Sequence, residues 1–171
     1  MCWISDNAIR QVAKEDIPVF KLAIRQADGK IYPYYYGGHL QYKVGKIATS
    51  SIHLFKNYNE SYEIGEGLHS YSPKCTILQD LFCSSRIKVL SRTQYHLSYY
   101  ETNNLCLLLC TIPKGTRYYV NDVEEYVSAK LKVEKAVDFP RVSYIAAYRS
   151  LEDKVKFINN ALTEWLHGKA K

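Results

Sequence analysis

The chain has 171 residues, of which 47% are hydrophobic and 23% are charged, values typical of a folded domain rather than of a disordered chain. We therefore expect one domain over residues 1–171. The longest strongly apolar run, Leu105 to Ile112, is far shorter than the ~20 residues that cross a membrane. The N-terminus has neither a basic nor an apolar leader segment, and both features predict a soluble, cytoplasmic protein without membrane contact.

The formal net charge is +6, and the lysines and arginines are scattered along the sequence. This charge favours weak, salt-sensitive binding to nucleic acid, although a mildly basic solvated surface is the simpler interpretation. The 16 tyrosines fit either a recognition surface or half-buried strands.

Cysteine and histidine spacing argues against a structural cross-link or a metal site. The five cysteines are odd in number and none lies in a CxxC pair, which predicts no disulfide framework and no zinc site. The five histidines also lack the spacing of a metal motif, so we expect neither metal nor cofactor. Cys2 would be an N-terminal nucleophile only after removal of Met1; a buried or incidental thiol is the alternative.

In chain order, the first predicted element is a strand over residues 19–25, with Lys21 on its polar face. Asp28-Gly29 predicts a hairpin turn to a strand over residues 31–36, in which Pro33 indicates an edge position. A third strand is expected over residues 39–44. Residues 45–66 are polar with little periodicity, which predicts a long loop.

The middle of the chain predicts a helix and then a buried strand. Ser72-Pro73 is typical of a helix start, and apolar residues follow at helical spacing (Ile77, Leu78, Leu81 and Phe82). Leu105 to Ile112 is apolar on both faces, which predicts the most buried strand of a covered sheet.

The last third predicts two strands and a terminal helix. The strands are expected at residues 117–120 and 126–137, the second with Leu131 and Val133 inward. An apolar stripe predicts an amphipathic helix over about residues 150–167, ended by Gly168. Strands followed by a terminal helix predict an α+β fold with a mostly antiparallel sheet and few helices.

Four segments resemble an uncharacterised family of small bacterial and phage-borne proteins: Met1-Cys2-Trp3-Ile4, Gly67-Leu68-His69-Ser70, Ile112-Pro113-Lys114-Gly115-Thr116 and Tyr126-Val127-Ser128-Ala129-Lys130-Leu131. The resemblance lies in patches between residues 1 and 137, and no activity is known for the family. It therefore implies kinship and a bacterial origin, without a function.

A second resemblance concerns the order Gly67-Leu68-His69-Ser70-Tyr71, Leu107-Leu108-Leu109-Cys110 and Glu125-Tyr126-Val127. This order is similar to the C-terminal half of ADP-ribosyltransferases of the poly-ADP-ribose polymerase type. The resemblance implies an enzyme that uses NAD, with Tyr71 or His69 beside the nicotinamide and Glu125 as the catalytic residue. The sequence departs from that family because His69 stands where its tyrosine belongs, and because Gly38-His39 reverses its His-Gly pair.

The leading interpretation is nevertheless a non-catalytic binding or interaction module, because no set of polar residues converges in the sequence. Its partner stays open, with a protein as one candidate. Its expected pocket is bounded by His69, Ser70, Tyr71, Tyr126 and Ser128, with Lys114 nearby and with Ser128 and Lys130 on one strand face. A nucleic-acid-binding domain is the other alternative, since Arg117-Tyr118-Tyr119 and the Lys130/Lys132 pair combine aromatic and basic side chains.

Overall fold

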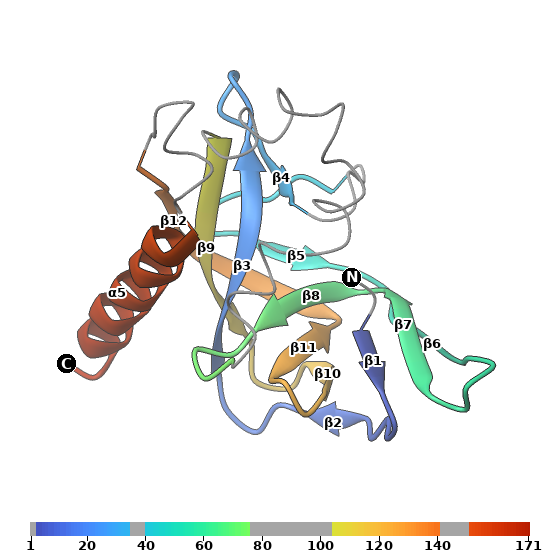
Figure 1. Ribbon diagram of the computed structural model, residues 1–171. Coiled ribbons are helices and arrows are strands. Elements are labelled where there is room, and N and C mark those ends of the chain that lie inside the picture. Colours follow the sequence, from blue (N-terminus) through green and yellow to red (C-terminus); the bar gives the residue numbers. More distant parts are fainter. Residues whose placement is uncertain (1–2, 35–39, 76–103, 141–150) are drawn as a thin grey trace. The chain divides into compact units, whose positions relative to one another are not determined.

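A computed structural model describes residues 3–34, 40–75, 104–140 and 151–171 (Figure 1). Their contacts divide the chain into two compact units, which are described separately. Unit 1 comprises Met1–Lys21, Tyr42–Thr76 and Leu108–Ala136, and unit 2 comprises Leu22–Gln41, Ile77–Leu107 and Val137–Lys171. The expectation of one domain over the whole chain stays a prediction.

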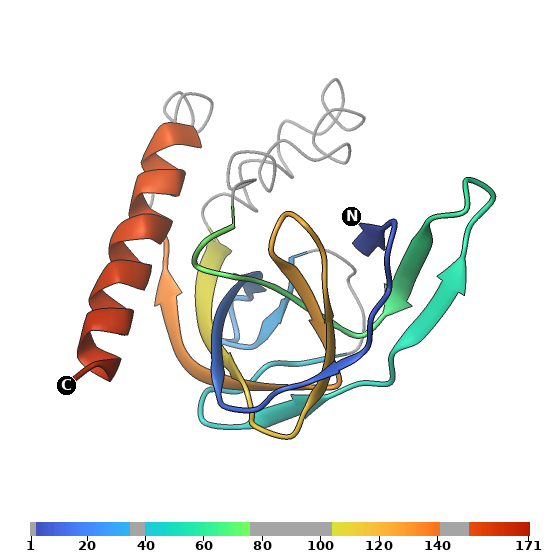
Figure 2. The same cartoon turned by 90° about the horizontal axis from the view of Figure 1, so that it is seen from below.

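Unit 1 is built from strands (Figure 2), and most of them are short. Those wholly inside it are β1 (Trp3–Ser5), β2 (Gln11–Val12), β5 (Ile47–Thr49), β6 (His53–Lys56), β7 (Tyr62–Glu66), β8 (Leu68–Tyr71), β10 (Arg117–Val120) and β11 (Glu125–Ser128). Three longer strands, β3 (Ile17–Arg25), β9 (Leu105–Ile112) and β12 (Lys130–Asp138), contribute residues to both units. The strand pairs whose registers are described are antiparallel, as expected for this α+β fold.

The main sheet has the order β2-β10-β11-β8-β3-β9-β12-β5. β9 lies in its middle, between β3 and β12, and all eight residues of β9 are buried. A strand that is covered on both faces is stabilised by apolar side chains on both. The prediction that Leu105 to Ile112 is the most buried strand is confirmed, since no other described strand has eight buried residues.

A second sheet in unit 1 has the order β1-β7-β6. Its inner face contributes Trp3 and Ile64, which form a buried cluster with Val127 of β11. The Trp3 indole also lies edge-on to the Tyr119 ring, with 6.0 Å between the ring centroids. These contacts join the second sheet to the main sheet.

Residues 45–66 contain β5, β6 and β7, so the prediction of a long loop here is wrong. These strands have three to five residues each, and all four residues of β6 are exposed. A short strand with two solvated faces has no reason to alternate apolar with polar residues, so its sequence lacks the usual signal. Of the strand expected over residues 39–44, the described part, residues 40–44, contains only a single bridge residue at Tyr42.

Another correction concerns the strand expected over residues 126–137. It is divided at Ala129 into β11 and β12, which pair with different neighbours. Leu131 and Val133 are buried, as expected, but Ser128 is buried and Lys130 is exposed. Ser128 and Lys130 therefore do not share a strand face.

The hairpins β6–β7 and β10–β11 use the same kind of turn. In each, an asparagine side chain caps the loop: Asn57 Oδ1 accepts from the Ser61 amide at 3.1 Å, and Asn121 Oδ1 accepts from the Glu125 amide at 2.9 Å. The fourth loop residue, Glu60 or Glu124, has a positive φ of 64° or 63°. Asparagine is favoured at the start of such turns because its side chain bonds to the backbone further on.

In unit 2, β3 and β4 (Ile31–Pro33) form the predicted hairpin at Asp28-Gly29, and Gly29 adopts a φ of +83°. Among the described residues β4 pairs only with β3, which is the edge position that Pro33 predicts. Arg25 Nε donates to Asp138 Oδ1 at 2.7 Å. The helix predicted to follow Ser72-Pro73 lies outside the described residues beyond Cys75.

The C-terminal helix α5 spans Leu151–Lys169. Ile158 and Leu162 are buried and fall on one stripe, so the predicted amphipathic helix is confirmed. Gly168 lies inside this helix rather than ending it. Among the described residues, no helix has the length and apolar character needed to cross a membrane.

Gly67, between β7 and β8, lies at a close approach of the two sheets. Its φ is +133°, and a Cβ at this position would clash with Val127 Cγ1. Gly115 also has a positive φ, +82°, but nothing lies within 4 Å of its Cβ position. Among the described glycines, only Gly67 therefore combines an unfavourable backbone angle with a steric conflict.

We expect Gly67→Ala to lower the free energy of unfolding by about 1–3 kcal/mol more than Gly115→Ala, because only the first change also overpacks the core. Urea unfolding of both variants measures the difference. Equal losses would mean that Val127 moves aside without cost.

Candidate functional site

The residues that the sequence singled out meet on β8 and β11. These strands pair with Tyr71 opposite Glu125, Ser70 opposite Tyr126 and His69 opposite Val127. Two segments more than fifty residues apart in the sequence are thus direct neighbours. Lys114 lies elsewhere, in the turn after β9, where its amide donates to Asp16 Oδ1 at 2.8 Å.

The alternation of side chains along a strand divides these residues between two faces. His69 and Tyr71 share one face with Glu125, whereas Ser70, Tyr126 and Ser128 lie on the other. All of them except Tyr126 are buried. The arrangement resembles the interior of a folded sheet more than the wall of an open pocket.

On the first face, the Glu125 carboxylate is held from two sides. Its Oε1 lies 3.3 Å from His69 Nδ1, and its Oε2 accepts from Asn121 Nδ2 at 3.3 Å. Its backbone carbonyl accepts from the Trp3 indole at 3.1 Å. Only 2% of Glu125 is exposed, so this residue is embedded in intramolecular contacts.

Lys21 is a member of this region that the sequence analysis missed. It was expected on the polar face of β3, but only 7% of it is exposed, and its Nζ donates to the His69 carbonyl at 2.6 Å. The amine also lies 5.8 Å from the centre of the Tyr42 ring. Its neighbours on the same strand face, Val19 and Ala23, are apolar, and this was the available signal that the face is buried.

Burial shifts the titration of these side chains. It lowers the pKa of Lys21 to about 8, against the opposing influence of Cys110 and Glu125. Burial likewise lowers the pKa of His69, although the contact with Glu125 raises it. On the second face, burial raises the pKa of Tyr126 to about 12, and the Ser70 Oγ is buried without a hydrogen-bond partner among the described residues.

The residues proposed for nucleic-acid stacking do not form one surface. Tyr119 packs against the buried cluster of Trp3, whereas Tyr118 lies on the opposite face of β10 and contacts the Tyr126 ring at 5.5 Å. Lys130 and Lys132 are exposed on β12. Only one of the two tyrosines is therefore placed where a base could stack.

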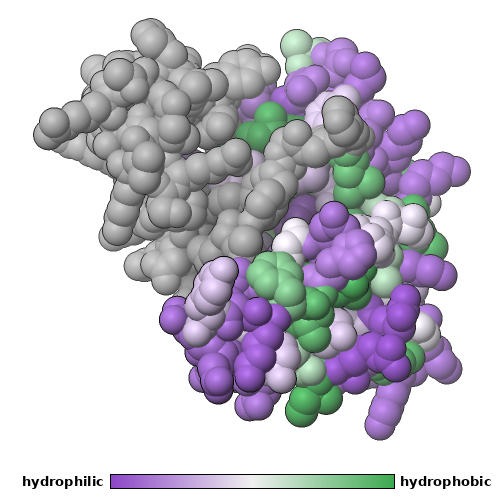
Figure 3. Space-filling model, turned by 90° about the vertical axis from the view of Figure 1, so that its right-hand side faces the viewer, coloured by the Kyte–Doolittle hydropathy of each residue, from purple (hydrophilic) through white to green (hydrophobic). Residues whose placement is uncertain are grey.

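The most exposed apolar side chains of unit 1 include several on the second sheet. Leu54 and Phe55 of β6 are 37% and 48% exposed, Ile4 of β1 is 51% exposed, and Tyr58 at the hairpin tip is fully exposed. Figures 1 and 2 both show the β6–β7 hairpin extending away from the other strands of unit 1. In the view onto this side, apolar groups lie among polar ones (Figure 3).

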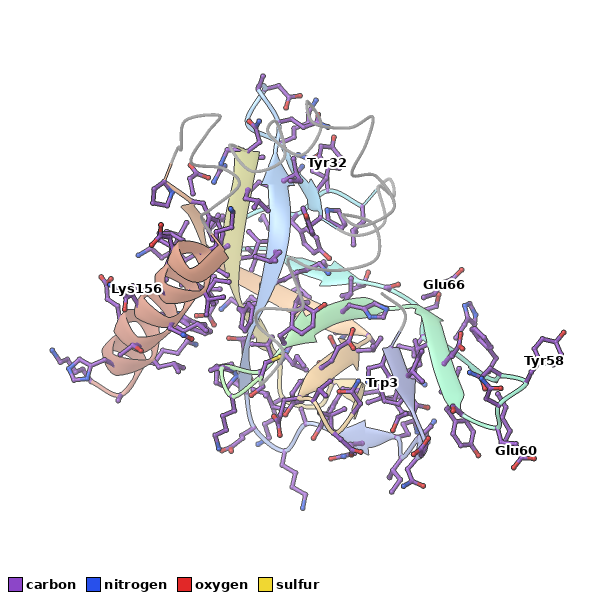
Figure 4. The ribbon with its side chains drawn as sticks, in the orientation of Figure 1. Trp3, Tyr32, Tyr58, Glu60, Glu66 and Lys156 are labelled. Atoms are coloured by element: carbon purple, nitrogen blue, oxygen red, sulfur yellow. The ribbon has the colours of Figure 1, made fainter. Side chains whose placement is uncertain are left out.

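β6 is also an edge strand, since among the described residues it pairs only with β7. Its backbone groups on the other side are therefore available for a further strand. Tyr58 and Glu60 lie at the tip of the hairpin, and Glu66 lies at its base (Figure 4).

Within the described ranges, no group of three or more His, Cys, Asp or Glu side chains could hold a metal ion.

In comparisons with known proteins, no family model matches the chain, and no curated protein or solved structure matches it.

We expect the stability that Lys21 contributes to depend on pH. Because its pKa is about 8 in the folded chain and about 10.4 in an unfolded one, the unfolded chain binds more protons between these values. The free energy of unfolding should thus rise with pH in this window, by up to about 1.4 kcal/mol per pH unit.

The measurement is urea unfolding of the wild type and of Lys21→Met between about pH 7 and about pH 9. Over this range the free energy of unfolding of the wild type should rise relative to that of Lys21→Met. Lys132→Met replaces an exposed lysine and is the matched control, with little effect at any pH. Parallel pH profiles for wild type and Lys21→Met would contradict a buried, titrating amine.

Proposed function

We propose that the chain is a non-catalytic module that binds another protein, and that the exposed edge formed by β6 is its binding element. The observation that supports this most directly is the exposure of Leu54 and Phe55 on a strand with one unpaired side. Large apolar side chains that project from a surface are typical of interaction sites. An unpaired strand edge is a common way to bind an extended segment.

The same edge carries features that oppose unselective sheet addition. It has four residues, includes Lys56, and has a register irregularity between His53 and Leu54. A short length, a lysine and a bulge are features by which natural proteins protect edge strands from pairing with other chains. Leu54 and Phe55 of this edge remain available for side-chain contacts. We therefore expect a partner that is recognised by its side chains and not through backbone hydrogen bonds alone.

An ADP-ribosyltransferase-like enzyme using NAD remains the catalytic alternative. A catalytic carboxylate must reach the ligand, whereas Glu125 is 2% exposed and contacts His69 and Asn121. This geometry favours a structural role for Glu125. The nucleic-acid alternative has weaker support, because Tyr119 lies against the core.

We expect Glu125→Gln to lower the free energy of unfolding by about 1–3 kcal/mol, because a buried network loses its charged acceptor. Urea unfolding measures this loss, and isothermal titration of the wild type with NAD should give no heat of binding. NAD cleavage by the wild type that disappears in Glu125→Gln would instead support the transferase.

The binding role predicts that β6 selects peptides. A phage-displayed library of random peptides, panned on the wild-type chain, should yield sequences whose affinity falls about tenfold in Phe55→Ser, since truncating an aromatic anchor has an effect of this order. Circular dichroism checks that the variant is folded.

Ile47→Ser is the matched control, because Ile47 is an exposed apolar residue of β5, 52% accessible, outside the second sheet. The selected peptides should bind this variant as they bind the wild type. Selection of no peptide that depends on Phe55 would overturn the proposed binding element.

A further inference from the structure

We infer that the segment bound at β6 is extended and alternates basic with apolar side chains. This inference rests on the proposed function and adds the chemistry of the partner. The hairpin of residues 53–66 has three glutamates and one lysine, hence a formal charge of −2 with His53 neutral, in a chain whose net charge is +6. Within this hairpin Glu60 pairs with Lys56 and Glu66 with His53, so Glu63 is its one carboxylate without an ion pair among the described residues.

The outer face of the second sheet has a carboxylate between two apolar side chains. Glu63 of β7 is paired with Ile4 of β1 on one side and with Phe55 of β6 on the other. Directly paired residues of antiparallel strands point to the same face. Ile4, Glu63 and Phe55 therefore form one row across the three strands, on the face opposite Trp3 and Ile64.

Neighbouring groups fix the positions of the Glu63 and Phe55 side chains in this row. Asn57 Nδ2 donates to Glu63 Oε1 at 2.6 Å, which orients the carboxylate; its Oε2 has no hydrogen bond to any described residue. Gly65 has no side chain on this face, and Phe55 Cε1 lies 3.7 Å from where its Cβ would be. The absence of a side chain at Gly65 leaves the Phe55 ring beside an open stretch of β7.

An arginine suits this combination of groups. Its guanidinium donates charge-assisted hydrogen bonds to a carboxylate oxygen and also stacks on aromatic rings. On a strand added next to β6, a side chain facing outward would lie beside Phe55 and extend towards Glu63, about 10 Å away across two strand spacings. The alternate side chains of that strand would face the side of Leu54, which is 37% exposed and suits an apolar residue.

The test uses a fluorescein-labelled peptide of about eight residues, the length of a long strand, in which arginine and valine alternate. A second peptide with glutamate in place of arginine is its counterpart. Because the chain has a net charge of +6, an arginine-rich peptide has no general attraction to it, and binding reports on a local acidic surface. Fluorescence anisotropy should show tighter binding of the arginine peptide.

The variants assign that binding to the row of Ile4, Glu63 and Phe55. We expect Glu63→Gln to weaken the arginine peptide about threefold, as for a partly exposed ion pair, and Phe55→Ser to weaken it about tenfold. Glu15→Gln removes an exposed carboxylate outside the second sheet and should have no effect. Equal or tighter binding of the glutamate peptide, or equal effects of Glu15→Gln and Glu63→Gln, would overturn the inference.

The two proposals fail in different ways. Library peptides that depend on Phe55 but contain no basic residues would overturn the basic character of the partner and leave the binding role intact. Absence of any peptide that depends on Phe55 would overturn the binding role itself. Self-association of the chain that is lost in Phe55→Ser would assign the edge to a second copy of the chain and overturn the inference.

Discussion

The burial of Trp3 is the interaction on which the rest of unit 1 depends. Its indole ring packs with Ile64 and Val127, and its nitrogen donates to the carbonyl of Glu125. A buried aromatic ring whose polar atom is hydrogen-bonded provides apolar contacts, and the hydrogen bond also fixes the orientation of the ring. Because Trp3 belongs to the second sheet and Val127 and Glu125 to the main sheet, this side chain ties the sheet that carries the exposed hairpin to the main sheet.

The sequence predicted the parts of the fold where burial imposes a pattern. The two-sided apolar run of β9 and the stripe of α5 were recognisable because water is excluded from both faces of the first and one face of the second. β6 was not recognisable, since all four of its residues are exposed. The element that the binding role depends on therefore has no recognisable strand pattern in the sequence.

The candidate site was predicted in part. The sequence indicated candidate residues in Gly67 and the positions after it, which form β8. The pairing of β8 with β11 brings Glu125 beside His69. The sequence could not reveal that these side chains are buried or that they divide between two faces. It also placed Lys21 on the solvent side, because a lysine inside a strand is usually a surface residue; here a backbone carbonyl compensates for its burial.

The repeated asparagine turn has a consequence for how the hairpin tip can vary. In the loop from Asn57 to Ser61, the geometry is set by the Asn57 side chain and by backbone bonds between its two ends. Tyr58 is fully exposed, and it is Glu60, not Tyr58, that adopts the positive φ. The identity of the residue at the tip is thus free to change over evolution while the register of β6 against β7 stays fixed, so related chains could present different tip residues on an unchanged hairpin.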